Sequence, residues 1–327
     1  MSLSAATTDA IRFAPRRATH VTLFVGDHDR SRAFYHQVCG FEPVYYEEPV
    51  ELSLFSNGSS HHDLAILPIK YQSATRDAMA GTPGLNHVAW EMDTEKDLVA
   101  AYNRAIDAGF PIQRALTHTV SHSVYVFDPD GNSHEFYSDA TENWRTTYHG
   151  GSGGSVTSPW DPNAAPADTR QLYPAGDDIR RVETAALHPR RLSHLVFVTG
   201  DHDEMIDFCT EVAGLEIAHE SSDGGLVCMA SARASYPCSL ALVKGGGDMA
   251  PGFHHASYEI ADERDLAAAE AALVADGIAI ERRVDNGGKH SLFVRDPDGI
   301  RFEYTVARSP DFGAAASASP AERPYLV

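Results

Sequence analysis

The sequence predicts an α+β fold built from four β-α-β-β-β units. The first observation behind this prediction is an internal repeat, because residues 17–40 return in similar form as residues 191–214. The second observation is another repeat, in which residues 85–112 return as residues 253–280. The third is that helix-like periodicity alternates with short β-type runs within each half. Helices interleaved with antiparallel hairpins favour an α+β fold over a parallel sheet.

The elements of the first half follow one another in a clear order. The apolar run THVTLFV precedes an amphipathic helix at 29–38, and the strand-like runs PVYYE, VELSLF and LAILPI come next. A second round begins with LNHVAWEM, continues with a helix at about 94–108, and ends in strands up to Tyr137. The motif GDHD occurs at 26–29 and 200–203, where its aspartates are expected to cap the following helices.

The repeats divide the chain into two modules and three other segments. We expect modules at 17–139 and 189–308, joined by the Gly-, Ser-, Pro- and Asp-rich segment 140–188 as a linker or irregular wrapping. Residues 1–16 are expected to form a disordered tail and residues 309–327 a C-terminal tail. Duplication also predicts a pseudo-twofold relation between the modules, and the joining sheets favour a homo-oligomer.

Composition excludes several classes of function. The formal net charge is −20 and no run is rich in Lys or Arg, so nucleic acid and anionic membranes are poor partners. No apolar stretch has the length of a membrane helix, and the N-terminus lacks a signal-like apolar core. The four cysteines show no metal-finger spacing and favour a reducing compartment. We therefore expect a cytoplasmic protein without nucleic-acid or membrane partners.

The hairpin sequence SHSVYVFDPDGNSHEFY, residues 121–137, carries a carboxylate inside a strand. Its Asp-Pro-Asp-Gly turn suits a three-residue hairpin loop, which places Tyr125 opposite Glu135 on one face of the sheet. The second copy places Phe293 opposite Glu303. Since an unpaired carboxylate is costly on a buried strand face, we expect a positive group to meet it.

Two histidines accompany each glutamate at aligned positions. One histidine of each half lies in the first strand, and the other lies in the first strand of the second unit. The two sets are His20, His87 and Glu135, and His194, His255 and Glu303. Any one of these residues alone is more simply interpreted as an interior histidine or a strand-end acid. Together they favour a metal site, because two imidazoles and a carboxylate on one face of a ferrous ion leave positions open for substrate and oxygen.

These residues give the chain a specific resemblance. It resembles the vicinal oxygen chelate superfamily, and within it the extradiol, ring-cleaving catechol dioxygenases of two-module type, over nearly the whole chain outside the tails and linker. The hairpin signature of that family is matched by His118, Val124-Tyr125, Asp128-Pro129, Gly131 and Glu135. The family's histidine on a middle strand, often followed by Asp, is matched by His62-Asp63.

The resemblance implies an Fe(II)-dependent dioxygenase that cleaves the ring of a catechol-type aromatic diol with O2; Mn, Ni and Zn are alternative metals. It implies that His20, His87 and Glu135 are the metal ligands. His62 then matches the histidine that handles dioxygen and moves protons. His118 and Tyr125 match groups that hold the substrate beside the metal.

The two halves differ in the groups that transfer protons. Cys238, Asn286 and Phe293 stand in the second half where the first has His62, His118 and Tyr125. In many two-module members the C-terminal module carries the iron, but this difference leads us to expect catalysis in the N-terminal module. Whether the second triad binds a metal is left open at this point.

Other histidines compete for the same roles. His61 precedes His62, and in a strand only one of the two faces the site; the His-Asp pairing favours His62. The repeat favours His255 over His254. The hairpin register turns three further histidines away from the glutamates: His122, His134 and His290.

Two other functions are open. One is a glyoxalase- or epimerase-like metal-dependent isomerase or lyase, against which the set His62, His118 and Tyr125 argues because oxygen chemistry needs it. The other is a non-catalytic small-molecule binding protein resembling the drug-sequestering members of the fold. Two intact ligand triads argue against that possibility.

Overall fold

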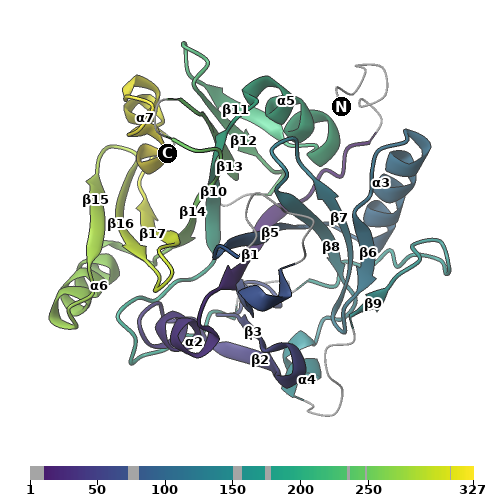
Figure 1. Cartoon of the computed structure of the whole chain (residues 1–327), viewed down its shortest axis with the longest axis horizontal. Helices are drawn as coiled ribbons and strands as arrows, with labels where there is room; N and C mark the ends of the chain where they lie inside the picture. Colours follow the sequence, from purple (N-terminus) through teal and green to yellow (C-terminus); the bar gives the residue numbers. More distant parts are fainter. Residues whose placement is uncertain are drawn as a thin grey trace.

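The computed structural model describes residues 11–72, 81–149, 157–173, 178–233, 236–246, 249–309 and 311–327. The strands form two curled sheets, one for each half of the chain, with helices packed against them (Figure 1). Each half contains two β-α-β-β-β units, which confirms the predicted α+β fold of four units.

The N-terminal sheet has nine strands in the order β2-β3-β4-β1-β5-β8-β7-β6-β9. Within each unit the first and last strands are parallel, namely β1 with β4 and β5 with β8. The two units meet where β1 pairs antiparallel with β5. The strands are β1 (Arg17–Val25), β2 (Pro43–Glu47), β3 (Leu52–Phe55), β4 (Leu64–Pro68), β5 (Gly84–Glu91), β6 (Arg114–Thr117), β7 (Ser121–Phe127), β8 (Ser133–Asp139) and β9 (Ser158–Pro159).

The C-terminal sheet repeats this arrangement in eight strands, in the order β11-β12-β13-β10-β14-β17-β16-β15. Here β10 is parallel to β13, and β14 is parallel to β17. The strands are β10 (Leu192–Thr199), β11 (Glu216–Glu220), β12 (Leu226–Ala230), β13 (Leu240–Lys244), β14 (Gly252–Glu259), β15 (Ile280–Asp285), β16 (Lys289–Arg295) and β17 (Arg301–Ala307).

One helix follows the first strand of each unit. These helices are α2 (His28–Gln37), α3 (Glu95–Asp107), α5 (His202–Asp207) and α6 (Glu263–Ala275). The GDHD aspartates Asp27 and Asp201 accept hydrogen bonds from main-chain N–H groups at the starts of α2 and α5, as predicted. The remaining turns are α4 (Trp144–His149), α7 (Gly313–Ser317), α8 (Arg323–Leu326) and the 3-10 turns η1 (Glu48–Val50) and η2 (Ile69–Tyr71).

The two faces of β1 serve different purposes. Val21 and Leu23 point into the main apolar core, which residues of both modules share. Thr22 and Phe24 lie on the opposite face, where they line a cavity. Because side chains alternate along a strand, His20 lies on the cavity side too. This alternation brings a polar site to one face of an otherwise apolar sheet.

Reciprocal contacts join the two modules. The main-chain N–H of Gly26 donates to Asp298, 2.9 Å away, in the hairpin turn of the other module. The equivalent Gly200 donates to Asp130, 3.1 Å away, in the hairpin turn of the first module. Because each module contributes the same glycine and the same aspartate, the contacts agree with the expected pseudo-twofold relation.

Residues 11–16 depart from the expected disordered tail. Ile11 and Phe13 are buried in the shared core, because their apolar side chains cover the space beside α5. The chain of α5 continues as a π-helix at Phe208–Ala213. Main-chain N–H groups of residues 12–14 donate to carbonyl oxygens of residues 211–213 in this π-helix. Residues 1–10 lie outside the described residues.

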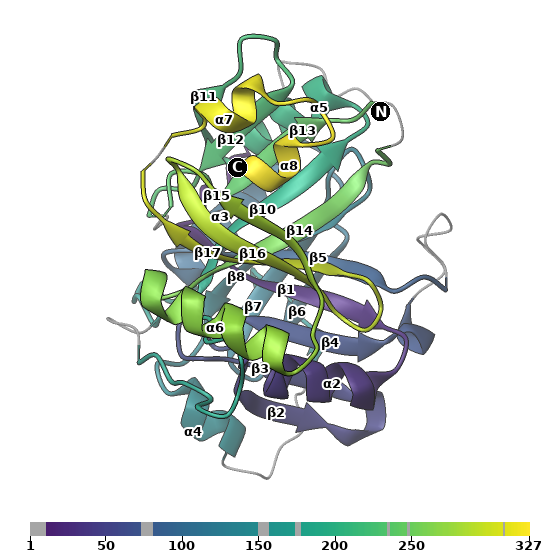
Figure 2. The same cartoon turned by 90° about the vertical axis from the view of Figure 1, so that its left-hand side faces the viewer.

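The segments around the modules pack against them. In segment 140–188, the short strand β9 pairs with β6, and Trp144 of α4 is buried. Residues 311–327 contain α7 and α8, which fold back over the C-terminal sheet beside β10 and β13 (Figure 2). Phe312 and Val327 of this segment are buried in a small apolar cluster there.

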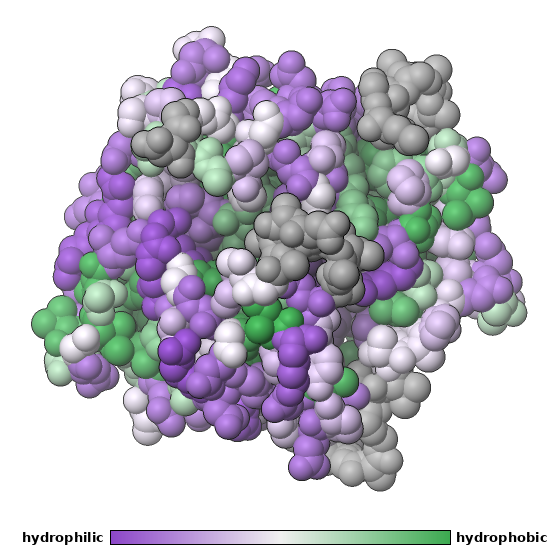
Figure 3. All heavy atoms as spheres, in the orientation of Figure 1, coloured by the Kyte–Doolittle hydropathy of each residue, from purple (hydrophilic) through white to green (hydrophobic). Residues whose placement is uncertain are grey.

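The surface agrees with the charged composition of the chain. Hydrophilic residues cover most of the face in Figure 3, and a hydrophobic area lies over the alanine-rich helix α6. Within the part of the chain that the structure describes, none of the helices has the length and apolar character needed to cross a bilayer. The four cysteines are buried free thiols.

Candidate active site

The three expected metal ligands of the N-terminal module converge. Nε2 of His20 on β1 and Nε2 of His87 on β5 lie 3.1 and 3.0 Å from the same oxygen, Oε2 of Glu135 on β8. All three side chains are buried. Adjacent strands of one sheet therefore direct two imidazole nitrogens and one carboxylate oxygen to a common point.

Local backbone and side-chain contacts orient the two imidazoles. The pairing of β1 with β5 is irregular between Ala18 and His20, and a bulge of this kind re-aims the next side chain. In His87, Nδ1 lies 2.7 Å from Oδ1 of Asn86, and this contact orients the ring with Nε2 toward Glu135. An imidazole oriented in this way can bind a cation through Nε2.

The protonation states also suit a metal. Burial lowers the pKa of His20 to about 4, so this imidazole is neutral at pH 7. Burial alone opposes the charge of Glu135, but hydrogen bonds with His20 and His87 hold its pKa well below the ordinary range. Metal ligands must be neutral imidazoles and ionised carboxylates. The donor set thus fits a divalent transition metal.

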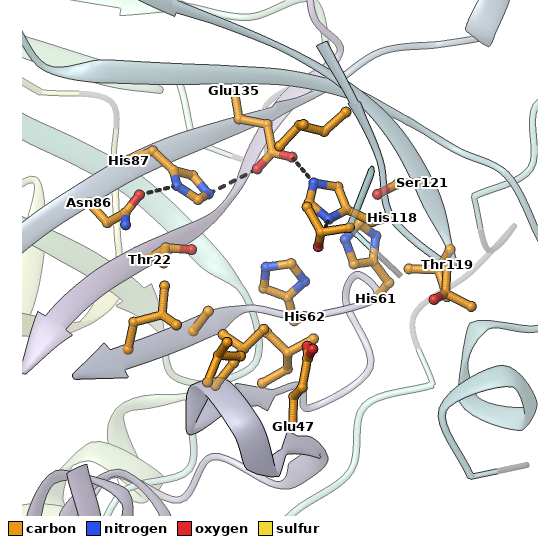
Figure 4. A pocket seen from close by; sticks show the side chains of 18 of the residues that line it. Thr22, Glu47, His61, His62, Asn86, His87, His118, Thr119, Ser121 and Glu135 are labelled. Carbon is orange, nitrogen blue, oxygen red and sulfur yellow. Dashed lines mark hydrogen bonds and ion pairs between the residues drawn. The ribbon is translucent and has the colours of Figure 1, made fainter. Parts of the chain in front are cut away.

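Tyr125 and His118 surround the other oxygen of Glu135. The register places Tyr125 directly opposite Glu135, as the turn predicted. Its hydroxyl donates to Oε1 of Glu135 at 2.8 Å and lies 3.1 Å from Nε2 of His118. His118 itself lies 3.9 Å from Oε1. Figure 4 shows Glu135 between His87 and His118.

His61 and His62 lie across the cavity from Glu135 (Figure 4). Both line the cavity, so the expectation that only one of them faces it is wrong. Strand alternation does not apply, because both precede β4 in an irregular segment. Nδ1 of His61 lies 2.8 Å from the buried carboxylate of Asp139, and the ring of His62 packs 3.7 Å from that of His20. Nδ1 of His62 has no hydrogen-bond partner among the described residues.

Three histidines lie away from this cavity, as expected from the register. His122 contacts Glu95 at 2.7 Å, and His290 contacts Glu263 in the same way in the second module. His134 is enclosed on the opposite face, between Trp90 and Asp128. None of the three is among the residues that line the cavity.

The cavity of the N-terminal module has a volume of about 450 Å³. His87, Glu135, His62, His118 and Tyr125 form its polar end. Apolar side chains from β1, β3 and β4 and the turns beside them form a wall, namely Phe24, Val50, Leu52, Leu54, Ala65 and Leu67. The volume is typical of a site for a small organic molecule.

The C-terminal module also brings its triad together. Nε2 of His194 and of His255 lie 3.2 and 3.5 Å from Oε2 of Glu303, and all three residues are fully buried. Phe293 lies opposite Glu303, as predicted. The second oxygen of Glu303 has a different partner from that of Glu135, because Nζ of Lys289 lies 2.5 Å from Oε1.

Several residues that contact the two triads or their neighbours are hard to identify from the sequence. Asn86 precedes the expected ligand His87, and its polar side chain next to that ligand is the only local hint that the two residues interact. Asp139 and Lys289 lie outside the family motif, so their contacts with His61 and Glu303 emerge only from the sheet pairing. Asn286 is the counterpart of His118, and its Oδ1 accepts hydrogen bonds from the main-chain N–H groups of Gly288 and Lys289.

Comparison with known proteins agrees with this geometry. The model of the Glyoxalase/Bleomycin resistance protein/Dioxygenase superfamily matches residues 17–136 and 191–304, one segment in each module. Biphenyl-2,3-diol 1,2-dioxygenase 2 of Rhodococcus globerulus is 29% identical over 178 residues, which are 53% of this chain and 90% of that protein. Metapyrocatechase 2 of Cupriavidus necator is 28% identical over 205 residues, 61% of this chain and 56% of that protein.

The chain therefore spans less than two thirds of the second relative's length. Among solved structures, the Mn(II)-bound glyoxalase of Novosphingobium aromaticivorans matches with a TM-score of 0.64 and 21% identity, over 89% of this chain and 82% of that chain. At this identity the likeness shows the fold alone. The two matched segments and the two-module architecture together show that the chain belongs to the Glyoxalase/Bleomycin resistance protein/Dioxygenase superfamily.

Proposed function

We propose that the chain is an Fe(II)-dependent extradiol dioxygenase whose active site lies in the N-terminal module. The observation that carries this proposal is the single cavity that His87 and Glu135 line together with His62, His118 and Tyr125. A ligand set beside three groups that can hold or move protons is what oxygen-dependent ring cleavage needs. The two relatives above bear the names of ring-cleaving enzymes, which supports the reaction class.

His20, His87 and Glu135 would hold the metal. When bound there, Fe(II) supplies open positions for the diol and dioxygen and the redox chemistry that joins them. The reaction is balanced without a further reductant, because one diol and one O2 give one ring-opened product that contains both oxygen atoms. The protein must therefore supply orientation and proton transfer.

His62 is the proposed base and acid of the site. Burial lowers its pKa well below the ordinary value of 6.5, so its imidazole is neutral at pH 7 and can accept a proton from a diol hydroxyl. His62 lines the cavity, and its buried Nδ1 has no partner among the described residues, so no neighbouring acid or amide fixes its protonation. The same imidazole can return the proton to the product later in the cycle.

His118 and Tyr125 are proposed to orient the diol at the opposite side. Burial raises the pKa of Tyr125 well above 10, so the phenol keeps its proton and acts as a hydrogen-bond donor. Burial lowers the pKa of His118 to about 4, so its ring is neutral. The pair can hold a substrate oxygen without placing a further charge next to Glu135.

The apolar wall favours a diol that carries an apolar substituent. The six apolar side chains of this wall lie next to the polar end, and Leu116 and Val120 also line the cavity. Burial of alkyl or aryl groups against such a surface contributes about 25 cal/mol per Å² of area removed from water. A charged substituent against this wall would lose its hydration without gaining a partner there, since Glu47 and Arg114, the charged side chains that line the cavity outside its polar end, are not part of the wall. We therefore propose alkyl- or aryl-substituted catechols as the substrate class.

The shared fold keeps a metal-dependent isomerase as the second candidate, because a glyoxalase structure has the same architecture. The two functions make different demands on the site. An isomerase needs no O2 and leaves the number of oxygen atoms in its substrate unchanged. Oxygen consumption therefore separates them directly.

The test is anaerobic reconstitution with Fe(II), followed by addition of O2 and a series of catechols with apolar, charged or no substituent. Absorbance reports the yellow ring-opened product, and an electrode reports O2. We expect His87→Ala to abolish activity and the matched His255→Ala to retain it. Loss of activity in His255→Ala alone would assign the chemistry to the C-terminal module. Iron binding without O2 consumption for any diol would favour the isomerase.

A further inference from the structure

The C-terminal triad has the ligand types of a metal site but a different environment. In the N-terminal module, the two histidines face Oε2 of Glu135, and Oε1, here called the outer oxygen, accepts a hydrogen bond from the neutral hydroxyl of Tyr125. In the C-terminal module, the outer oxygen of Glu303 meets the ammonium group of Lys289 at 2.5 Å. Lys289 is only 1% exposed, so a buried positive charge already accompanies this carboxylate.

The position of Lys289 follows from the hairpin. Lys289 is the first residue of β16 and corresponds to Ser121, the first residue of β7. Ser121 lines the N-terminal cavity, and its short side chain leaves that space open. The lysine in the same place reaches across to Glu303 of β17 and also donates to the main-chain oxygen of Val327. A single side chain thus connects the triad to the segment that follows the module.

That segment fills the counterpart of the N-terminal cavity. Ala65 and Leu67 of β4 line the first cavity, and the sheet pairing makes Ala241 and Val243 of β13 their counterparts. Instead of bordering open space, Ala241 and Val243 pack in one apolar cluster with side chains of residues 311–327. The contributors from that segment are Phe312, Ala315, Leu326 and Val327.

Charge and closure both oppose a metal at this triad. A divalent ion beside His194, His255 and Glu303 would place two further positive charges close to the buried ammonium, where repulsion is only weakly screened. The packed segment also fills the space from which water or substrate would complete the coordination. Nε2 of both histidines and Oε2 of the glutamate have no hydrogen-bond partner among the described residues, so the ligand atoms themselves are available.

We propose that Lys289 is a built-in cation that takes the place of a metal at Glu303, and that it keeps the C-terminal triad metal-free. The difference in metal binding between the two triads then depends on this side chain. Removal of the ammonium opens the triad, because the three ligand atoms are already assembled. This inference concerns the second module and does not depend on the reaction at the first.

The experiment measures Co(II) binding by equilibrium dialysis and visible absorption in a His87→Ala background, which removes a ligand of the first site. With Lys289 intact, we expect no Co(II) to bind at the C-terminal triad, so the additional substitution His255→Ala should not change the amount of bound Co(II). Lys289→Ser, which restores the residue found in the N-terminal module, is expected to create one site per chain that depends on His255. We expect the affinity of the triad for Co(II) to rise by at least about 100-fold.

A second variant guards against a failure of folding. Lys289→Gln removes the charge but keeps a side chain of similar length that can still donate to Glu303 and Val327. Circular dichroism checks that each variant is folded. A His255-dependent Co(II) site in either folded variant supports the proposal. A His255-dependent site in the protein with Lys289 intact overturns it, and so does the absence of new binding in both folded variants. Failure of the proposed function would instead show as absent metal or activity at the first site.

Discussion

Replacement of Tyr125 by Phe tests how the protein holds the carboxylate of Glu135. The Tyr125 hydroxyl donates to Oε1 of Glu135 at 2.8 Å, and the tyrosine is 2% exposed. Phe293 occupies the equivalent place opposite Glu303 in the other module. A benzyl side chain therefore fits the position, and the substitution removes only the hydroxyl.

The expected loss of stability follows from the type of hydrogen bond. Removal of the donor from a buried carboxylate costs about 1.5–3 kcal/mol. His118, whose Nε2 lies 3.9 Å from Oε1, can turn toward the vacated oxygen and moderate the loss. We therefore expect Tyr125→Phe to lower the free energy of unfolding of the metal-free protein by about 2 kcal/mol, which exceeds the cost of a lost neutral hydrogen bond.

Tyr258→Phe is the matched control. The Tyr258 hydroxyl is also buried and also donates at 2.8 Å, but its acceptor is the neutral main-chain oxygen of Asp63. Removal of a neutral hydrogen bond of this kind costs about 0.5–1.5 kcal/mol. Urea-induced unfolding in the presence of a chelator, followed by tryptophan fluorescence, measures both variants. If Tyr125→Phe costs no more than Tyr258→Phe, the hydroxyl does not hold an ionised carboxylate and our description of the site is wrong.

Two further predictions concern the segment before β4. His62→Gln is expected to keep the metal content of the wild-type protein and to lower kcat for ring cleavage by at least about 100-fold, the range of a lost proton-transfer group; loss of the metal together with activity would make His62 a ligand instead. Burial raises the pKa of Asp63 to about 7, whereas the unfolded chain ionises near 3.8, so the folded state holds the extra proton between these values. Between pH 5 and pH 8 the free energy of unfolding should therefore fall by about 3 kcal/mol more than in Asp63→Asn; urea unfolding at these two pH values checks this, and an equal change in both proteins would refute it.

The features that could be predicted from the sequence are those that local geometry determines. The Asp-Pro-Asp-Gly turn defines the hairpin register, and this register brings Tyr125 opposite Glu135 and Phe293 opposite Glu303. The repeat likewise predicts four equivalent units, because each unit carries its own helix and its own periodicity. In both cases the information lies within one short stretch of chain.

The features that could not be predicted depend on where separate stretches meet. His61 and His62 both line the cavity because residues 56–63 form an irregular segment, whereas the sequence led us to expect both histidines in a strand. The pairing of His61 with Asp139 joins residues 78 positions apart. Ile11 and Phe13 are buried because they cover a π-helix whose geometry has no signal in the sequence.

The same distinction explains why two matching triads do not imply two equivalent sites. The ligand residues depend on strand register, which the duplication preserves in both modules. The fitness of each triad for a metal depends on the group beside the outer carboxylate oxygen and on the space in front of the ligands. A phenol and an open cavity accompany Glu135, whereas an ammonium group and a packed segment accompany Glu303. Because one substitution at Lys289 changes the charge without altering a ligand, metal binding at the second triad can be separated experimentally from the presence of its ligands.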